Sequence, residues 1–226
     1  MITDDWKYYY KMARGGSWDT TNLLYTPIVN PEETIMCMQY DENSSYQKNK
    51  RLTKEVVDFF FEREVKFLTK FQGYSWAPKL LDVNLDTRSV FVEFNGTQTI
   101  NRILMTEGRD LNAEYPNWKL QMFDFLEDLE KADCYKMALY PHCFFFDNNR
   151  QLKTFDFYSC VDRQDCLIPR SAVENLIGGD STGRFDSATE GDYINFEIFF
   201  KNTVMHHLDE RWPDNPFPEF YKKIYD

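Results

Sequence analysis

One stretch of this sequence constrains the fold more than any other, the twenty residues LTKEVVDFFFEREVKFLTKF at positions 52–71. Their spacing predicts a long amphipathic helix whose buried face holds Val57, Phe60, Phe61, Leu68 and Phe71. An acid, Glu64, falls on that same apolar face. Burying a carboxyl group is unfavourable unless it meets a partner. Glu64 therefore lies either at the solvent edge of the face or at a site where it meets a cation.

Short β-strands are predicted on both sides of this helix. Three apolar runs separated by polar turns occupy residues 6–40, and two more flank the turn NLDTRS within residues 76–94. A second amphipathic helix is predicted over residues 117–132, with a core-facing side formed by Leu120, Phe123, Leu126 and Leu129. The runs CFFF and QLKTFDF around DNNR then predict a β-hairpin over residues 143–157. The expected fold class is α+β.

The C-terminal part of the chain is predicted to contain a long surface segment followed by a helix. Residues 162–191 are rich in Gly, Asp, Ser and Arg and are expected to form a long surface segment. Loops of this length are usually functional or mobile. A last helix is predicted to begin at Tyr193, in the run YINFEIFFKNTVMHHL.

Composition narrows the class of protein. The 226 residues are 42% hydrophobic and 17% aromatic, enough for a sizeable core in one compact domain or two small lobes. The net charge of −11 argues against a nucleic-acid partner. We expect a cytoplasmic protein without a membrane partner, because the sequence shows neither a signal-peptide pattern nor an apolar run of about 18 residues.

The number and spacing of the cysteines also favour a reducing compartment. Five cysteines without a CxxC pair favour free thiols in a reducing compartment and disfavour a zinc site.

The order of the predicted elements resembles that of protein-kinase-like folds, a group that includes the aminoglycoside phosphotransferases. EREVKFLTKFQGYSWAPKLLDV resembles the glutamate-bearing helix of that family, with Glu64 as its glutamate. FVEFNG resembles the strand before the interlobe hinge, so Glu93 and Asn95 would offer backbone groups to an adenine. KTFDFY resembles the DFG motif, which implies that Asp156 binds magnesium. In a degenerate site Asp156 would either keep that role with a nucleotide or serve only to hold the lobes together through hydrogen bonds. GDYINFEIFF resembles the opening of a later helix, which implies that Asp192 braces the catalytic loop.

This resemblance implies a two-lobed molecule with ATP and magnesium as its cofactors. Residues 1–94 would form the N-lobe, an antiparallel sheet of five strands with one long helix. Residues 95–226 would form a mainly helical C-lobe that carries the hairpin. The resemblance is strongest to short, divergent kinase-like proteins of phages and bacteria, so a phage-encoded chain would act in the host cytoplasm.

The chemical residues of the family are largely replaced. KMALYPHC stands where HRDLKPEN is expected, so Ala138 and Cys143 occupy the positions of the catalytic aspartate and asparagine. Met38 occupies the position of the phosphate-binding lysine, and Tyr158 that of the DFG glycine. The glycine-rich loop is reduced to a pair, Gly15 and Gly16. Loss of a general base alone lowers the rate roughly 10²–10⁴-fold, so we expect a pseudokinase that binds and regulates a protein partner.

Two other functions stay open. An active, atypical phosphotransferase would need Lys11 to reach the phosphates or His142 to act as base or metal ligand, with Asp156 retained as catalytic and metal-binding acid. A structural component of an assembly would bind no nucleotide. A cleft filled by Met38 and Phe157 would argue against nucleotide binding. In a binding module, the acidic surface would suit a basic protein partner.

Overall fold

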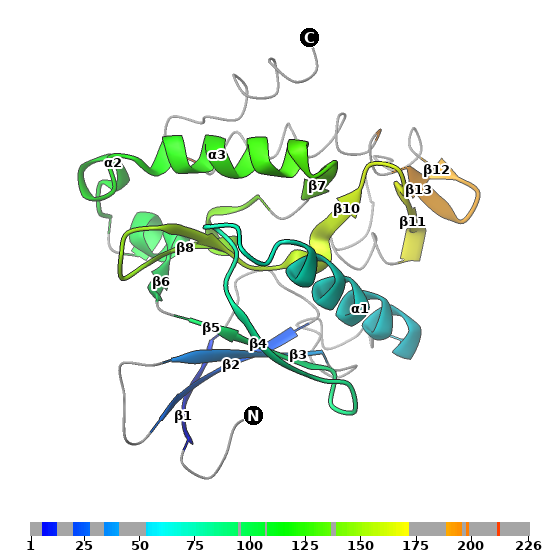
Figure 1. Cartoon of the computed structure of the whole chain (residues 1–226), viewed down its shortest axis with the longest axis horizontal. Coiled ribbons are helices and arrows are strands. Elements are labelled where there is room, and N and C mark those ends of the chain that lie inside the picture. Colours follow the sequence, from blue (N-terminus) through cyan, green and yellow to red (C-terminus); the bar gives the residue numbers. More distant parts are fainter. Residues whose placement is uncertain are drawn as a thin grey trace.

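The computed structural model describes residues 34–40, 53–94, 96–106, 108–136, 139–171 and 189–195, single residues 198 and 212, and the backbone of 6–12 and 20–27. These residues form a mixed α+β structure with several small antiparallel sheets. Figure 1 shows the largest sheet at one end of the molecule and the helix α3 at the other, with α1 between them.

The largest sheet contains the five strands that the sequence predicts before residue 95. Its order is β1 (Trp6–Met12), β2 (Thr20–Pro27), β3 (Ile35–Tyr40), β5 (Ser89–Glu93) and β4 (Leu80–Asn84). All neighbouring pairs are antiparallel. The strand β3 lies at the centre of the sheet, and five of its six residues are buried: Ile35, Met36, Cys37, Met38 and Tyr40.

Helix α1 (Lys54–Lys70) packs its apolar face against this sheet and against the rest of the molecule. It begins where the Thr53 hydroxyl accepts a hydrogen bond from the backbone N–H of Val56, as an N-cap does. The predicted apolar face is confirmed, since each of its members is at most 6% exposed: Val57, Phe60, Phe61, Leu68 and Phe71. Glu64 is fully buried. The interpretation that it lies at the solvent edge is therefore wrong.

The remaining described elements follow β5 in the sequence. The helices are a π-helix η1 (Arg102–Thr106), α2 (Leu111–Glu114), α3 (Trp118–Lys131), and two 3₁₀ turns, η2 (Pro141–Cys143) and η3 (Phe157–Ser159). One small sheet has the order β6 (Gly96–Thr99), β8 (Phe144–Asp147), β9 (Leu152–Thr154), and a second pairs β7 (Cys134–Lys136) with β10 (Cys160–Asp162). A third has the order β11 (Leu167–Pro169), β13 (Tyr193–Asn195), β12 (Thr189–Glu190). The predicted hairpin is confirmed as β8 and β9.

Two sequence-based expectations are wrong. Leu120 is 62% exposed, because the bulky Trp118 sets the buried side of α3, which holds Trp118, Met122, Phe125, Leu126 and Leu129. Residues 193–195 form the strand β13, paired with both β11 and β12, so no helix begins at Tyr193. Within the described ranges, every helix falls short of the length or the hydrophobicity needed to span a lipid bilayer.

Side-chain contacts join α1 to the second half of the chain. The indole N–H of Trp76, just after α1, donates to Asp128 of α3 at 3.0 Å, and its ring packs 4.9 Å from that of Phe125. On the surface of α1, Lys66 and Lys70 donate to the Asp162 carboxylate of β10 at 2.6 and 2.7 Å. Partial burial alone would raise the pKa of Asp162, but hydrogen bonds from the two lysines outweigh it and lower that pKa to about 2.

This pKa predicts how stability depends on pH. A carboxyl group with a pKa of about 3.9 in the unfolded chain and a lower one in the folded chain stabilises the fold above the unfolded value. That contribution disappears as the pH falls toward 2. We therefore expect Asp162→Asn to lower the free energy of unfolding by about 1 kcal/mol at pH 7 and to have little effect near pH 2. Urea titrations between pH 2 and pH 7 measure this. Asp165→Asn, at an exposed neighbouring acid, should change little, and a pH-independent loss in Asp162→Asn would contradict the ion pairs.

Candidate functional site

The candidate site centres on a turn that follows β9. Asp156 adopts the left-handed conformation, with φ of 65° and ψ of 48°, which Asp tolerates better than most residues. The chain then makes the short turn η3 and enters β10. Residues 156–160 are all buried. Buried backbone N–H and C=O groups require hydrogen-bond partners, and in this turn side chains from elsewhere supply several of them.

Two consecutive residues of α1 hold this turn. The Oε2 atom of Glu64 accepts the backbone N–H of Tyr158 at 2.7 Å and the phenol O–H of Tyr40 at 3.0 Å. The guanidinium group of Arg63 donates to the carbonyl of Tyr158 at 3.0 Å and also to the carbonyl of Cys160. Burial lowers the pKa of Arg63. The carboxyl group of Glu64 thus links three segments: the strand β3, the helix α1 and the turn η3.

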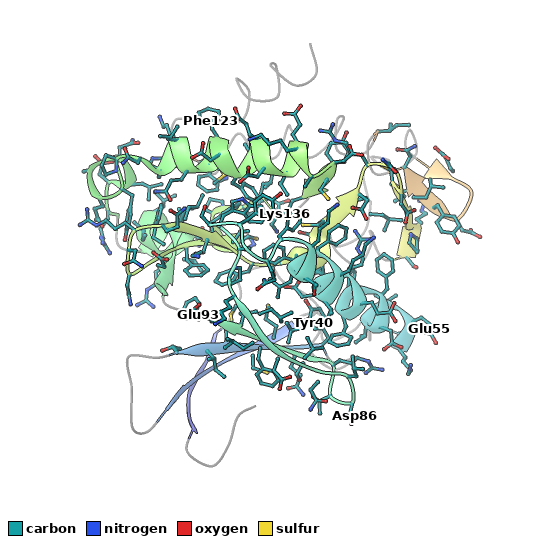
Figure 2. The ribbon with its side chains drawn as sticks, in the orientation of Figure 1. Tyr40, Glu55, Asp86, Glu93, Phe123 and Lys136 are labelled. Atoms are coloured by element: carbon teal, nitrogen blue, oxygen red, sulfur yellow. The ribbon has the colours of Figure 1, made fainter. Side chains whose placement is uncertain are left out.

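A buried lysine holds the same turn from the other side. Lys136 is 1% exposed, and its Nζ atom donates to the Asp156 carbonyl at 2.9 Å and to the Ser159 hydroxyl oxygen at 3.1 Å. It lies 5.9 Å from the centre of the Phe157 ring, within the range of a cation–π contact. Figure 2 shows Lys136 in the interior, between the levels of α3 and the large sheet.

The two aromatic side chains of the turn point in different directions. Phe157 packs against Trp76, with ring centres 6.2 Å apart, and against Phe71 at 6.1 Å. It therefore lies in the core next to the C-terminal end of α1. Tyr158 packs against Phe60 of α1 at 5.4 Å and Tyr40 of β3 at 6.2 Å. The Tyr158 ring therefore occupies the space between the large sheet and α1.

The loop expected to carry the catalytic residues lies beside this turn. The Cys143 carbonyl accepts the backbone N–H of Phe155 at 2.9 Å and the Thr154 hydroxyl at 3.1 Å, so η2 adjoins the residues before Asp156. Cys143 is buried, and His142 stacks on Tyr140 with ring centres 5.3 Å apart. The Asp156 residue is only 2% exposed. The structure thus brings together the segments that carry His142, Cys143, Asp156 and Glu64.

Other predicted site residues lie apart from this turn. The backbone N–H of Glu93 donates to the Lys79 carbonyl at 2.9 Å. Glu93 also lines a hollow together with Pro78, Lys79, Phe145, Asp147 and Lys153. Asp192 is exposed in the turn between β12 and β13, where its carbonyl accepts the N–H of Arg170.

The remaining predicted site residues lie either on strand β1 or outside the described residues. Lys11 lies on β1, opposite Leu23 of β2, which in turn lies opposite Cys37 of β3. Two strand spacings, roughly 10 Å, separate its backbone from β3. The positions outside the described residues are Gly15, Gly16, Asn95 and Ala138.

Three of the five cysteines are unsuited to nucleophilic chemistry. All five have free thiols. Burial raises the pKa of the thiols of Cys37 and Cys134 to about 11 and that of Cys160 to about 12, so these three are protonated at neutral pH. Among the described residues, no three His, Cys, Asp or Glu side chains gather in a group that could hold a metal ion.

Sequence reasoning missed three residues that build the site, Tyr40, Arg63 and Lys136. The signal for Lys136 was present, since it interrupts the mostly apolar run CYKMALY. Arg63 precedes the one acid on the apolar face of α1, but its partners are backbone carbonyls, which no sequence pattern marks. Tyr40 ends a predicted strand, and nothing local indicates that its hydroxyl reaches α1.

Comparison with known proteins leaves the family of this chain open. No protein-family model matches the sequence, and no curated protein matches it either. The function is therefore argued from the geometry of the site.

The site predicts that Glu64 is far more important for stability than its exposed neighbour Glu62. We expect Glu64→Ala to lower the free energy of unfolding by about 2–4 kcal/mol, because the buried N–H of Tyr158 and O–H of Tyr40 lose their acceptor. Glu64→Gln keeps a carbonyl oxygen and should lose less. Chemical denaturation of these variants beside the matched control Glu62→Ala measures the difference. Equal losses in Glu64→Ala and Glu62→Ala would contradict the described hydrogen bonds.

Proposed function

We propose that this chain is a catalytically impaired kinase-like protein that acts as a binding module for another protein. The observation that carries the proposal is the set of hydrogen bonds of Glu64. Its carboxyl group accepts from the Tyr40 hydroxyl and the Tyr158 backbone. Met38 stands where the resemblance expects the lysine that this acid would orient. An acid that serves phosphate binding in an active enzyme serves here to hold the fold together.

The arrangement of elements supports the kinase-like part of the proposal. Three antiparallel strands precede α1, two follow it, and α1 packs between the large sheet and the turn after Asp156. Residues 1–94 would then be the N-lobe and residues 95–226 the C-lobe, with the hairpin β8–β9 in the place of the catalytic hairpin. The acid Glu64 and the turn at Asp156 meet through a direct hydrogen bond from the Tyr158 backbone N–H.

The chemistry around the turn supports the impaired part. Phosphoryl transfer depends on cations and donors that neutralise the charge developing on the phosphate. Met38 has no charge and is 1% exposed, while Phe157 is fully buried. The N–H groups of Glu93 and Phe94, at the expected hinge, already donate to the carbonyls of Lys79 and Thr34. These features favour a site that does not turn over magnesium-bound ATP.

The charge of the chain suggests the chemistry of the partner. With 37 acidic and 26 basic residues, the surface repels other acidic molecules and attracts basic ones. We therefore propose a basic protein partner, whose binding should weaken as the salt concentration rises.

A turnover assay tests the proposal. We expect the purified protein to form ADP from ATP and magnesium no faster than a protein-free blank, and we expect Asp156→Asn to change nothing. Asparagine suits this replacement because it tolerates the left-handed conformation of residue 156. Asp124→Asn, at an exposed position of α3, is the matched control.

Magnesium-dependent ADP formation that is lost in Asp156→Asn and kept in Asp124→Asn would overturn the proposal. It would instead favour the atypical phosphotransferase, with Asp156 as its metal-binding acid.

A further inference from the structure

The small sheet of β11, β12 and β13 has one buried face and one exposed face. Figure 1 shows this sheet at the edge of the molecule. Ile168 of β11 and Ile194 of β13 lie directly opposite each other, and both are at most 1% exposed, so this face packs on the core. Successive side chains of a strand point to opposite faces of a sheet. The neighbours of these two isoleucines therefore point away from the core, toward solvent.

The outer face carries apolar side chains. An antiparallel sheet that packs one face on the core usually presents polar side chains on the other. Here Leu167 of β11 is 46% exposed and Tyr193 of β13 is 48% exposed, and Pro169 lies directly opposite Tyr193. Ile198 is 38% exposed, and its backbone N–H donates to Oδ1 of Asn195, which shares this face, at 3.3 Å. Exposed apolar side chains that lie together and have a polar rim are typical of a protein-binding surface.

Carboxyl groups border these apolar side chains. Glu190 of β12 lies directly opposite Tyr193, so both side chains are on the outer face. The side-chain amide of Asn195 donates to Oε1 of Glu190 at 3.0 Å and holds this carboxyl group beside the apolar residues. Asp192, in the turn between β12 and β13, is exposed like Glu190, whereas Arg170 at the end of β11 is half-buried. The rim therefore presents negative charge next to an exposed aromatic ring.

We propose that this outer face, formed by Leu167, Pro169, Tyr193 and Ile198, is the docking surface for a basic segment of a partner protein. The segment places apolar side chains on Leu167 and Ile198. It also packs an arginine or lysine side chain on the Tyr193 ring, where the cation meets the carboxyl group of Glu190. The inference rests on the basic partner of the proposed function and is independent of the resemblance to kinases. A second copy of this chain is a less suitable occupant, because two copies with a net charge of −11 each repel one another.

The first arm of the test asks whether the outer face binds a basic, apolar segment. The probe is a short peptide that alternates leucine with arginine, and its control is the same peptide with glutamate in place of arginine. In an NMR titration, we expect the arginine peptide to shift the backbone amide resonances of Glu190 and Tyr193, and to bind less tightly as the salt concentration rises. We expect the glutamate peptide to leave them unshifted. No shift with the arginine peptide at low salt would overturn the proposal, and so would equal shifts with both peptides.

The second arm asks which side chains carry the binding. Tyr193→Thr removes the ring and keeps a residue that suits a β-strand, so we expect the Kd of the arginine peptide to rise roughly tenfold. Glu190→Gln keeps an oxygen for Asn195 but removes the charge, and should also raise the Kd. The matched control is Leu85→Ser, at a 74% exposed leucine in the turn after β4, and it should leave the Kd unchanged. An unchanged Kd in Tyr193→Thr, or an equal rise in Leu85→Ser, would overturn the docking surface.

These outcomes separate the docking surface from the proposed function. If the arginine peptide binds the wild type and Tyr193→Thr equally well, the basic partner stands and this surface is overturned. If the arginine peptide does not bind at all, both the surface and the basic partner are overturned, and the ADP assay still tests the impaired site on its own. Sedimentation of the wild type at rising concentration tests the second copy. A dimer that Tyr193→Thr dissociates would overturn the proposal in favour of self-association.

Discussion

The backbone of a buried turn must find hydrogen-bond partners, and the turn after Asp156 finds them in three ionisable side chains. Arg63 donates to two backbone carbonyls, and Lys136 donates to the carbonyl of Asp156 itself. Glu64 accepts one backbone N–H. Two of these residues lie on α1 and one on β7. The position of α1 relative to the rest of the molecule therefore depends on this turn, and through the Tyr40 hydroxyl the large sheet depends on it as well.

The same arrangement fixes the geometry of the turn. Hydrogen-bonded polar groups in a low-dielectric interior fix a single geometry, and losing one partner leaves the others buried without compensation. Glu64 accepts hydrogen bonds from a tyrosine hydroxyl and a backbone N–H. Lys136, the buried amine near Asp156, points to a carbonyl and to Ser159. The hydrogen bonds of Arg63, Glu64 and Lys136 hold the turn in place.

The parts of the fold that depend on local periodicity could be predicted from the sequence. The strands of the large sheet, α1 with its buried face and the hairpin after residue 143 follow from spacing and turn residues. The partners of Glu64 could not be predicted, because Tyr40 is 24 and Tyr158 94 positions away along the chain. The error at Leu120 has a similar origin. Several apolar residues of α3 fit helical spacing, and tertiary packing of the larger Trp118 decides which of them are buried.

Hydrogen exchange at the backbone amide of Tyr158 tests the central claim most directly. If the N–H donates to a buried carboxyl group that joins three segments, it exchanges only when the whole domain unfolds, as slowly as the amide of Met38 in β3. Glu64→Ala should then accelerate exchange at Tyr158 far more than at Met38. If the Tyr158 amide of the wild type exchanged as fast as that of Asn149 in the exposed hairpin turn, the turn would not be anchored by Glu64, and the account would be wrong.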